Sequence, residues 1–192
     1  MSIYNSLRVL KWKLIRAKSE NPPHVVKQLI ITNYVKKYKY NTLIETGTYF
    51  GEMINAQRDN FKKIYSIELS YDLYQKAKNR FQAFSHIELI NGDSGEKIKQ
   101  ILQQLNEPAV FWLDGHYSEG ITAKGNKNTP IEEELLHITI HPYPHIILID
   151  DARLFNNSED YPTVEKIKEI ISKNRVIDFF KVADDIIQIK LK

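Results

Sequence analysis

The sequence contains no cysteine, few glycines and no long apolar run. Without cysteine, the 192-residue chain can form neither a disulfide nor a thiolate metal site. No apolar stretch approaches the roughly 20 residues that a membrane span needs. The charged N-terminal residues also lack the apolar centre of a secretory signal peptide. We therefore expect a cytoplasmic protein with no transmembrane segment.

The charge is nearly balanced. Lys and Arg number 27 against 24 Asp and Glu, a formal net charge of +3, which creates no need for a nucleic-acid partner. With 42% hydrophobic residues, the chain is long enough to bury one full core. We expect a globular protein that acts on a small molecule.

From residue 42 onward, short apolar runs alternate with amphipathic segments such as 95–105. This alternation predicts right-handed crossovers and a parallel sheet. After a helix at 164–172, two runs flank a tight turn at 183–185 and should pair as a hairpin. The predicted fold is α/β: a Rossmann-like, doubly wound, mostly parallel seven-stranded sheet with an antiparallel C-terminal hairpin. Its strands are expected at 42–44, 64–67, 87–90, 110–113, 146–149, 176–182 and 186–191.

Residues 1–40 are predicted to form an N-terminal helical extension that precedes the domain at 41–192. A basic amphipathic helix is expected at 6–19 and a second helix at 25–38, with a proline break between them. Leu7, Leu10, Leu14 and Ile15 share one face of the first helix. This face predicts packing on the core or on a second copy in a homodimer; attachment to a membrane surface is the alternative.

Three aspartates follow two of the most apolar expected strands. Asp114 ends the strand at 110–113, and Asp150 and Asp151 end the strand at 146–149. The carboxyl ends of parallel strands form the ligand-binding edge of an open α/β sheet. Because clustered buried carboxylates are costly unless they are paired, a bound cation is expected. Oxygen ligands favour Mg²⁺ or a similar divalent ion; capping of the following turns is the alternative.

A glycine loop follows the first expected strand, with the sequence E-T-G-T-Y-F-G at 45–51. Gly47 permits a tight turn near a ligand, and Gly51 permits close helix packing. Glu68, about 20 residues further on, stands where an acidic residue binds a ribose. Glu45 would repel a diphosphate but suits a cofactor that carries an ammonium group. A simple tight turn is the alternative.

The third expected strand ends in N-G-D-S at 91–94. Asp93 is placed to accept a hydrogen bond from an adenine amine, with support from Ser94. Alternatively, Asp93 or Ser94 caps the helix that starts near Gly95. The two roles are compatible because a carboxylate has two acceptor oxygens.

In their order and spacing, these motifs resemble those of class I S-adenosylmethionine-dependent methyltransferases. The resemblance covers about residues 42–192, although the glycine loop has two glycines where many members have three. It implies that the cofactor S-adenosyl-L-methionine is bound by Glu45, Thr46, Gly47, Thr48, Tyr49, Gly51, Glu68, Asp93, Ser94 and Asp114. Asp114 together with Asp150 and Asp151 is similar to the metal site of metal-dependent O-methyltransferases, which include catechol-type and sugar-modifying enzymes.

Such chemistry needs a base, because a hydroxyl is a poor nucleophile until it loses its proton. We expect His116 to be the base beside Asp114, with Tyr117 as the second candidate; an ordinary loop histidine is the alternative. The polar segment 118–128 is expected to form a substrate lid. His137, His141 and His145 have helical spacing, but Pro142 and Pro144 argue against a zinc site there.

The sequence thus predicts a methyltransferase that transfers a methyl group to a hydroxyl of a sugar or another small-molecule acceptor, with the aid of a divalent metal. One alternative is a nicotinamide-dependent oxidoreductase on the same layout, which Glu45 disfavours. Another is a non-catalytic module in glycan assembly.

Overall fold

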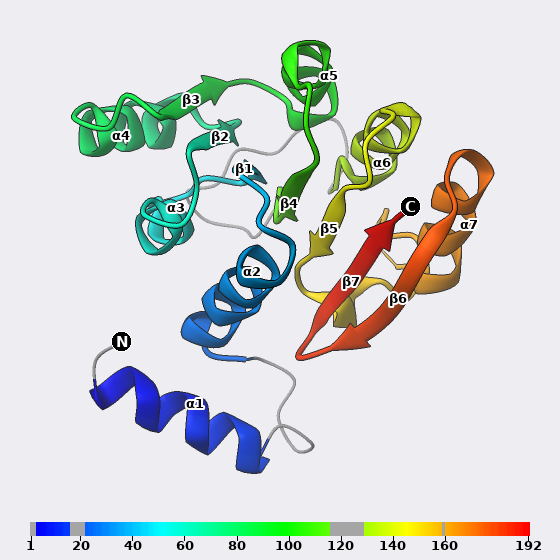
Figure 1. Cartoon of the computed structure of the whole chain (residues 1–192), viewed down its shortest axis with the longest axis horizontal. Coiled ribbons are helices and arrows are strands. Elements are labelled where there is room, and N and C mark those ends of the chain that lie inside the picture. The colour runs from blue at the N-terminus through cyan, green and yellow to red at the C-terminus, as the bar shows by residue number, and fades with distance from the viewer. Residues whose placement is uncertain (1–2, 16–21, 116–128, 159) are drawn as a thin grey trace.

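A seven-stranded sheet forms the centre of the protein, with helices around it (Figure 1). The computed structural model describes residues 3–15, 22–115, 129–158 and 160–192. The strand order is β3-β2-β1-β4-β5-β7-β6. The first five strands are parallel, and β7 pairs antiparallel with both β5 and β6. This confirms the predicted fold class. The strands are β1 (Thr42–Thr46), β2 (Lys63–Glu68), β3 (Ile87–Asn91), β4 (Ala109–Leu113), β5 (Ile146–Ile149), β6 (Ile177–Ala183) and β7 (Ile186–Leu191).

Helices cover both faces of the sheet (Figure 1). One face packs against α5 (Ser94–Gln104), α6 (Ile131–Ile140) and α7 (Val164–Asn174). The other packs against α2 (His24–Tyr38), α3 (Glu52–Gln57) and α4 (Tyr71–Phe81). Neighbouring residues of a central strand therefore enter opposite cores: Phe111 of β4 contributes to the first and Trp112 to the second. Burial on both faces explains why these strands are continuous apolar runs rather than alternating patterns.

The C-terminal hairpin turns at Asp184 and Asp185, whose φ angles are 54° and 56°. Two consecutive residues with positive φ are the mark of a type I′ turn, which matches the twist of a two-residue hairpin. Aspartate tolerates this conformation better than most residues. The predicted turn is confirmed, and Ala183 belongs to β6.

The first strand is longer than the sequence predicted. Strand β1 continues through Glu45 and Thr46, which the sequence placed in the glycine loop, because both residues still pair with β2 and β4. Helix α6 begins at Ile131, directly after Pro130. The hydroxyl of Thr129 accepts a hydrogen bond from the Ile131 N–H at 3.3 Å and satisfies one free donor of the helix start.

Helix α1 (Ile3–Ile15) packs differently from its predicted apolar face. Leu7, Leu10 and Leu14 are exposed, whereas Trp12 is buried and its indole N–H donates to Asp184 Oδ1 at 2.8 Å. This leucine face therefore does not cover the described part of the core, and its role in a homodimer stays a prediction. Within the described ranges, no helix combines the length and apolar character that crossing a bilayer requires.

Candidate cofactor and metal site

The first feature of the site is the turn that follows β1. Gly47 has a φ of +82°, and a Cβ at this position would lie 2.2 Å from the backbone carbonyl oxygen of Asp114. The Gly47 N–H donates to the carbonyl of Ile67 at 3.0 Å, and the Asp114 N–H donates to Thr46 at 3.1 Å. The ends of β1, β2 and β4 are thus held together by backbone contacts that leave no space for a side chain.

The second glycine of the loop starts α3. Gly51 has a φ of +74°, and a Cβ there would lie 2.5 Å from the ring of Phe81 on α4. A glycine is needed for both the left-handed backbone and the close approach of the two helices. The loop between the two glycines exposes Tyr49 and Phe50, whose rings contact each other with centroids 4.2 Å apart.

Glu45 is almost completely buried beneath this loop. Its Oε2 accepts a hydrogen bond of 2.5 Å from the Ser66 hydroxyl, which is itself 2.6 Å from the Thr48 hydroxyl. Burial raises the pKa of Glu45 to about 8, and the negative charges of Asp114 and Glu68 act in the same direction. A cation placed beside this carboxyl would favour its ionised form.

Glu68 at the end of β2 is held by backbone donors. Its carboxylate accepts from the Tyr49 N–H at 2.8 Å and from the Ser70 N–H at 2.9 Å. Burial raises its pKa, and these N–H groups oppose that shift. The carboxylate therefore joins the glycine loop to the start of α4, so its orientation is fixed.

Asp93 caps α5, as the second interpretation of the sequence proposed. Its Oδ1 accepts from the Gly95 N–H at 2.8 Å, and Ser94 is the first residue of the helix and is buried. One carboxylate oxygen of Asp93 is thus used by the helix start. A cap of this kind leaves the other oxygen for a ligand.

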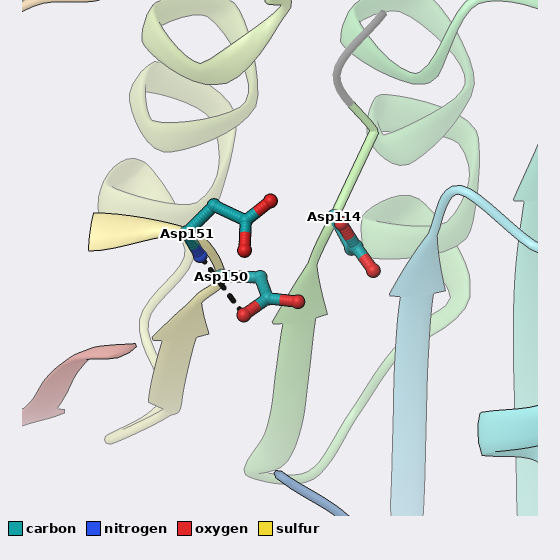
Figure 2. Close-up of side chains that lie close together, drawn as sticks. All are labelled: Asp114, Asp150 and Asp151. Atoms are coloured by element: carbon teal, nitrogen blue, oxygen red, sulfur yellow. Dashed lines mark hydrogen bonds between the residues drawn. The ribbon is translucent and has the colours of Figure 1, made fainter. Parts of the chain in front are cut away.

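The three aspartates lie together at the same edge of the sheet (Figure 2). Asp114, Asp150 and Asp151 each offer a carboxylate oxygen within 4.8 Å of the others. Asp150 Oδ1 accepts from the Asp151 N–H at 2.9 Å, which fixes the carboxylate and leaves Oδ2 for other partners. Asp151 has a φ of +52°, a left-handed conformation that lets both members of the pair face the same region.

Two cations that the sequence did not identify contact this cluster. Lys27 of α2 places Nζ 2.5 Å from Asp150 Oδ2 and 3.2 Å from Asp151 Oδ1. Arg153 lies 2.8 Å from Asp151 Oδ1 and also pairs with Asp185. Burial lowers the pKa of Lys27, but the neighbouring aspartates outweigh this effect and the net shift is upward, so the ammonium stays charged.

Glu134 of α6 is a second buried carboxyl that the sequence did not single out. Its Oε1 and the Oγ1 of Thr46 are buried without a hydrogen-bond partner among the described residues. Burial raises the pKa of Glu134 to about 7, against the effect of the nearby hydroxyls of Ser94 and Thr46. Glu134 and Asp150 both line one pocket, together with Gly115, Phe155 and Tyr161.

The remaining residues that the sequence singled out fall into two groups. His116, Tyr117 and the expected lid at 118–128 lie outside the described residues. His141 and His145 hydrogen-bond to each other at 2.8 Å, and His145 Nδ1 accepts from the Ala109 N–H at 3.1 Å. Burial lowers the pKa of His145 to about 3, so His145 is a neutral residue of the core. Among the described residues, Asp114, Asp150 and Asp151 form the one cluster of three side chains that could hold a metal ion.

The fold matches solved methyltransferases. The SAH-bound methyltransferase PaMTH1 of Podospora anserina is 17% identical, with a TM-score of 0.63 over 96% of this chain and 87% of that chain. The O-methyltransferase of Bacillus cereus, in complex with SAH, is 14% identical, with a TM-score of 0.63 over 100% and 92%. The chain therefore has the class I methyltransferase fold, as the motifs predicted.

The fold alone does not specify the methyl acceptor. The N-methyltransferase NodS of Bradyrhizobium japonicum also matches, at 16% identity and a TM-score of 0.53 over 86% of this chain and 93% of that chain. No protein-family model and no curated protein sequence matches the chain. The acceptor must therefore be argued from the side chains at the edge of the sheet.

Proposed function

We propose that the protein is an S-adenosylmethionine-dependent O-methyltransferase that acts on a hydroxyl of a sugar or another small molecule, with the aid of a divalent cation. The observation that carries this proposal is the meeting of two groups of residues at one sheet edge. Glu45, the Gly47 turn and Glu68 form one group, and the three aspartates form the other. Asp114 belongs to both, because its backbone abuts Gly47 and its carboxyl joins the acidic cluster.

The first group suits a nucleoside that carries an amino acid. In this proposal, Glu68 accepts hydrogen bonds from the ribose hydroxyls, and the cofactor's ammonium group favours ionised Glu45. Asp93 and Ser94 lie beside the adenine. The loop residues Thr46, Thr48, Tyr49 and Gly51 complete the cradle. Bound S-adenosylmethionine supplies the methyl group on a sulfonium, and the protein's contribution is to hold it in line with the acceptor.

The second group suits a hard divalent ion. All of its donors are carboxylate oxygens, the ligand type that Mg²⁺ and Ca²⁺ prefer. Two oxygens on opposite sides of a Ca²⁺ ion lie about 5 Å apart and those around Mg²⁺ about 4 Å, close to the spread of this cluster. Asp114, Asp150 and Asp151 are therefore the proposed ligands. A bound ion would stabilise the deprotonated hydroxyl of the acceptor, and His116 remains the predicted base, with Tyr117 as the second candidate.

Calorimetric titration with S-adenosylhomocysteine and, separately, with NADH tests the cofactor. We expect saturable binding of S-adenosylhomocysteine and no binding of NADH. Binding of NADH alone would replace the proposal with an oxidoreductase. Failure of both ligands to bind would favour a non-catalytic module.

Transfer of labelled methyl from S-adenosylmethionine to a panel of sugars and catechols tests the chemistry. We expect transfer that EDTA abolishes and Mg²⁺ restores, and that Asp150→Asn reduces by about 100-fold or more. Asp178→Asn, an exposed aspartate on β6, is the control and should leave transfer unchanged. Transfer that persists in EDTA and in Asp150→Asn would remove the metal from the proposal.

A further inference from the structure

Lys27 contacts two of the three aspartates that are the proposed metal ligands. Its Nζ lies 2.5 Å from Asp150 Oδ2, and the other oxygen of this carboxylate is already engaged by the Asp151 N–H. Lys27 therefore holds the oxygen of Asp150 that the backbone does not engage. The same ammonium lies 3.2 Å from Asp151 Oδ1.

An ammonium and a divalent ion compete for these oxygens. A metal at about 2.0 to 2.6 Å from the same atoms would lie close to Nζ, and two cations so near each other repel strongly. The Lys27 side chain is only 12% exposed, so its charge is poorly screened by water. The charged groups around Lys27 are the three aspartates and Arg153, which lies 2.8 Å from Asp151 Oδ1. His24 is also nearby, and burial and the charge of Lys27 lower its pKa, which favours the neutral ring.

We propose that Lys27 is a built-in competitor of the divalent ion and that helix α2 thereby sets the metal affinity of the aspartate site. This inference rests on the metal site of the proposed function. Without metal, Lys27 balances the charge of the aspartates and keeps the site ordered. When an ion binds, the ammonium leaves Asp150 Oδ2. The metal therefore binds more weakly than three carboxylates alone would allow.

Manganese binding to the full chain tests the competition, with the free Mn²⁺ signal in electron paramagnetic resonance as the readout. Lys27→Met removes the charge and keeps much of the side-chain volume. We expect Lys27→Met to bind Mn²⁺ at least about tenfold more tightly than the wild type, because the repelling charge is gone. Lys36→Met, an exposed lysine of the same helix, should bind like the wild type. In Lys27→Met with Asp150→Asn, the gain should disappear.

Several outcomes would overturn the inference. The inference is wrong if Lys27→Met binds Mn²⁺ no more tightly than the wild type, or if its gain in Mn²⁺ affinity persists when Asp150→Asn is added. It is also wrong if neither the wild type nor Lys27→Met binds Mn²⁺. If Lys27→Met folds only with metal present, a comparison of Mn²⁺ binding by Lys27→Arg and Lys27→Gln replaces it as the test. The arginine should bind weakly, as the wild type does, and the glutamine tightly; equal binding by both would contradict competition. S-adenosylhomocysteine binding in the same samples separates failure of the metal site from failure of the methyltransferase proposal.

Discussion

Gly47 and Asp114 touch through their backbones, and no side chain fits between them. A Cβ on Gly47 would lie 2.2 Å from the Asp114 carbonyl oxygen, closer than nonbonded atoms can approach. This contact joins the turn after β1 to the end of β4. It therefore fixes the distance between the proposed cofactor cradle and the first of the three aspartates.

Gly47→Ala should disturb both stability and cofactor binding. The left-handed φ of +82° and the clash with Asp114 must be relieved by movement of the turn. We expect a loss of about 1–3 kcal/mol in the free energy of unfolding and about tenfold or greater weakening of S-adenosylhomocysteine binding. Urea denaturation and calorimetry measure the two effects. Gln103→Ala, on the exposed side of α5, is the control, and equal behaviour of both variants would contradict the role given to the turn.

Glu68→Gln should weaken the loop and the ribose contact together. The amide keeps one acceptor oxygen, so the N–H groups of Tyr49 and Ser70 can no longer both bond to a carboxylate. Hydrogen bonds to charged groups contribute about 1.5–3 kcal/mol, and we expect a destabilisation of this size. S-adenosylhomocysteine binding should fall as well. Glu88→Gln, on the neighbouring strand β3, breaks only an exposed ion pair with Lys63 and should change stability by less than about 1 kcal/mol.

Glu134 should make the protein less stable as the pH rises from 5 to 8. The unfolded carboxyl ionises near its ordinary pKa of 4.5, whereas burial raises the folded pKa to about 7. Between these values the folded state keeps a proton that the unfolded state has released. The free energy of unfolding therefore falls through this window, by on the order of 3 kcal/mol, and the loss is complete above the folded pKa.

The side chain in Glu134→Gln cannot ionise. Its free energy of unfolding, measured by urea denaturation, should therefore change less between pH 5 and pH 8 than that of the wild type. Glu45 changes stability in the same direction in both proteins, so its effect cancels in the difference. Glu132→Gln, exposed on the same helix, should retain the slope of the wild type. A slope in Glu134→Gln equal to that of the wild type would show that this carboxyl is ionised in the folded state as well.

The sequence predicted the sheet well because its signal is local. Apolar runs, turn residues and strand–helix alternation specify the order of elements without any knowledge of distant contacts. Strands β5 and β7 have the predicted bounds. The acidic cluster followed from the same logic, since Asp114 and Asp150 stand at the ends of adjacent parallel strands.

The remaining site residues depend on contacts that a single sequence does not reveal. Lys27 is 123 residues away from Asp150, and its helix shows little segregation of apolar and polar residues, so nothing marks it as buried. Glu134 follows two exposed glutamates. From the sequence, it would be interpreted as a third acidic residue that interacts favourably with the dipole at the helix N-terminus. Its spacing from Ile131 and Ile138, which face the core, was the available sign that it points inward.

The turn between β6 and β7 connects parts of the chain that are far apart in sequence. Asp184 accepts from the indole of Trp12, while the backbone and side chain of Asp185 accept from the N–H groups of Ala152 and Arg153, next to Asp151. Two successive aspartates thus clamp helix α1 and the backbone after β5 to one hairpin tip. A substitution or a cut at this tip would loosen both attachments at once. It would thereby disturb the backbone beside Asp151 and change the aspartate cluster, although the tip itself lies outside the ligand-binding edge.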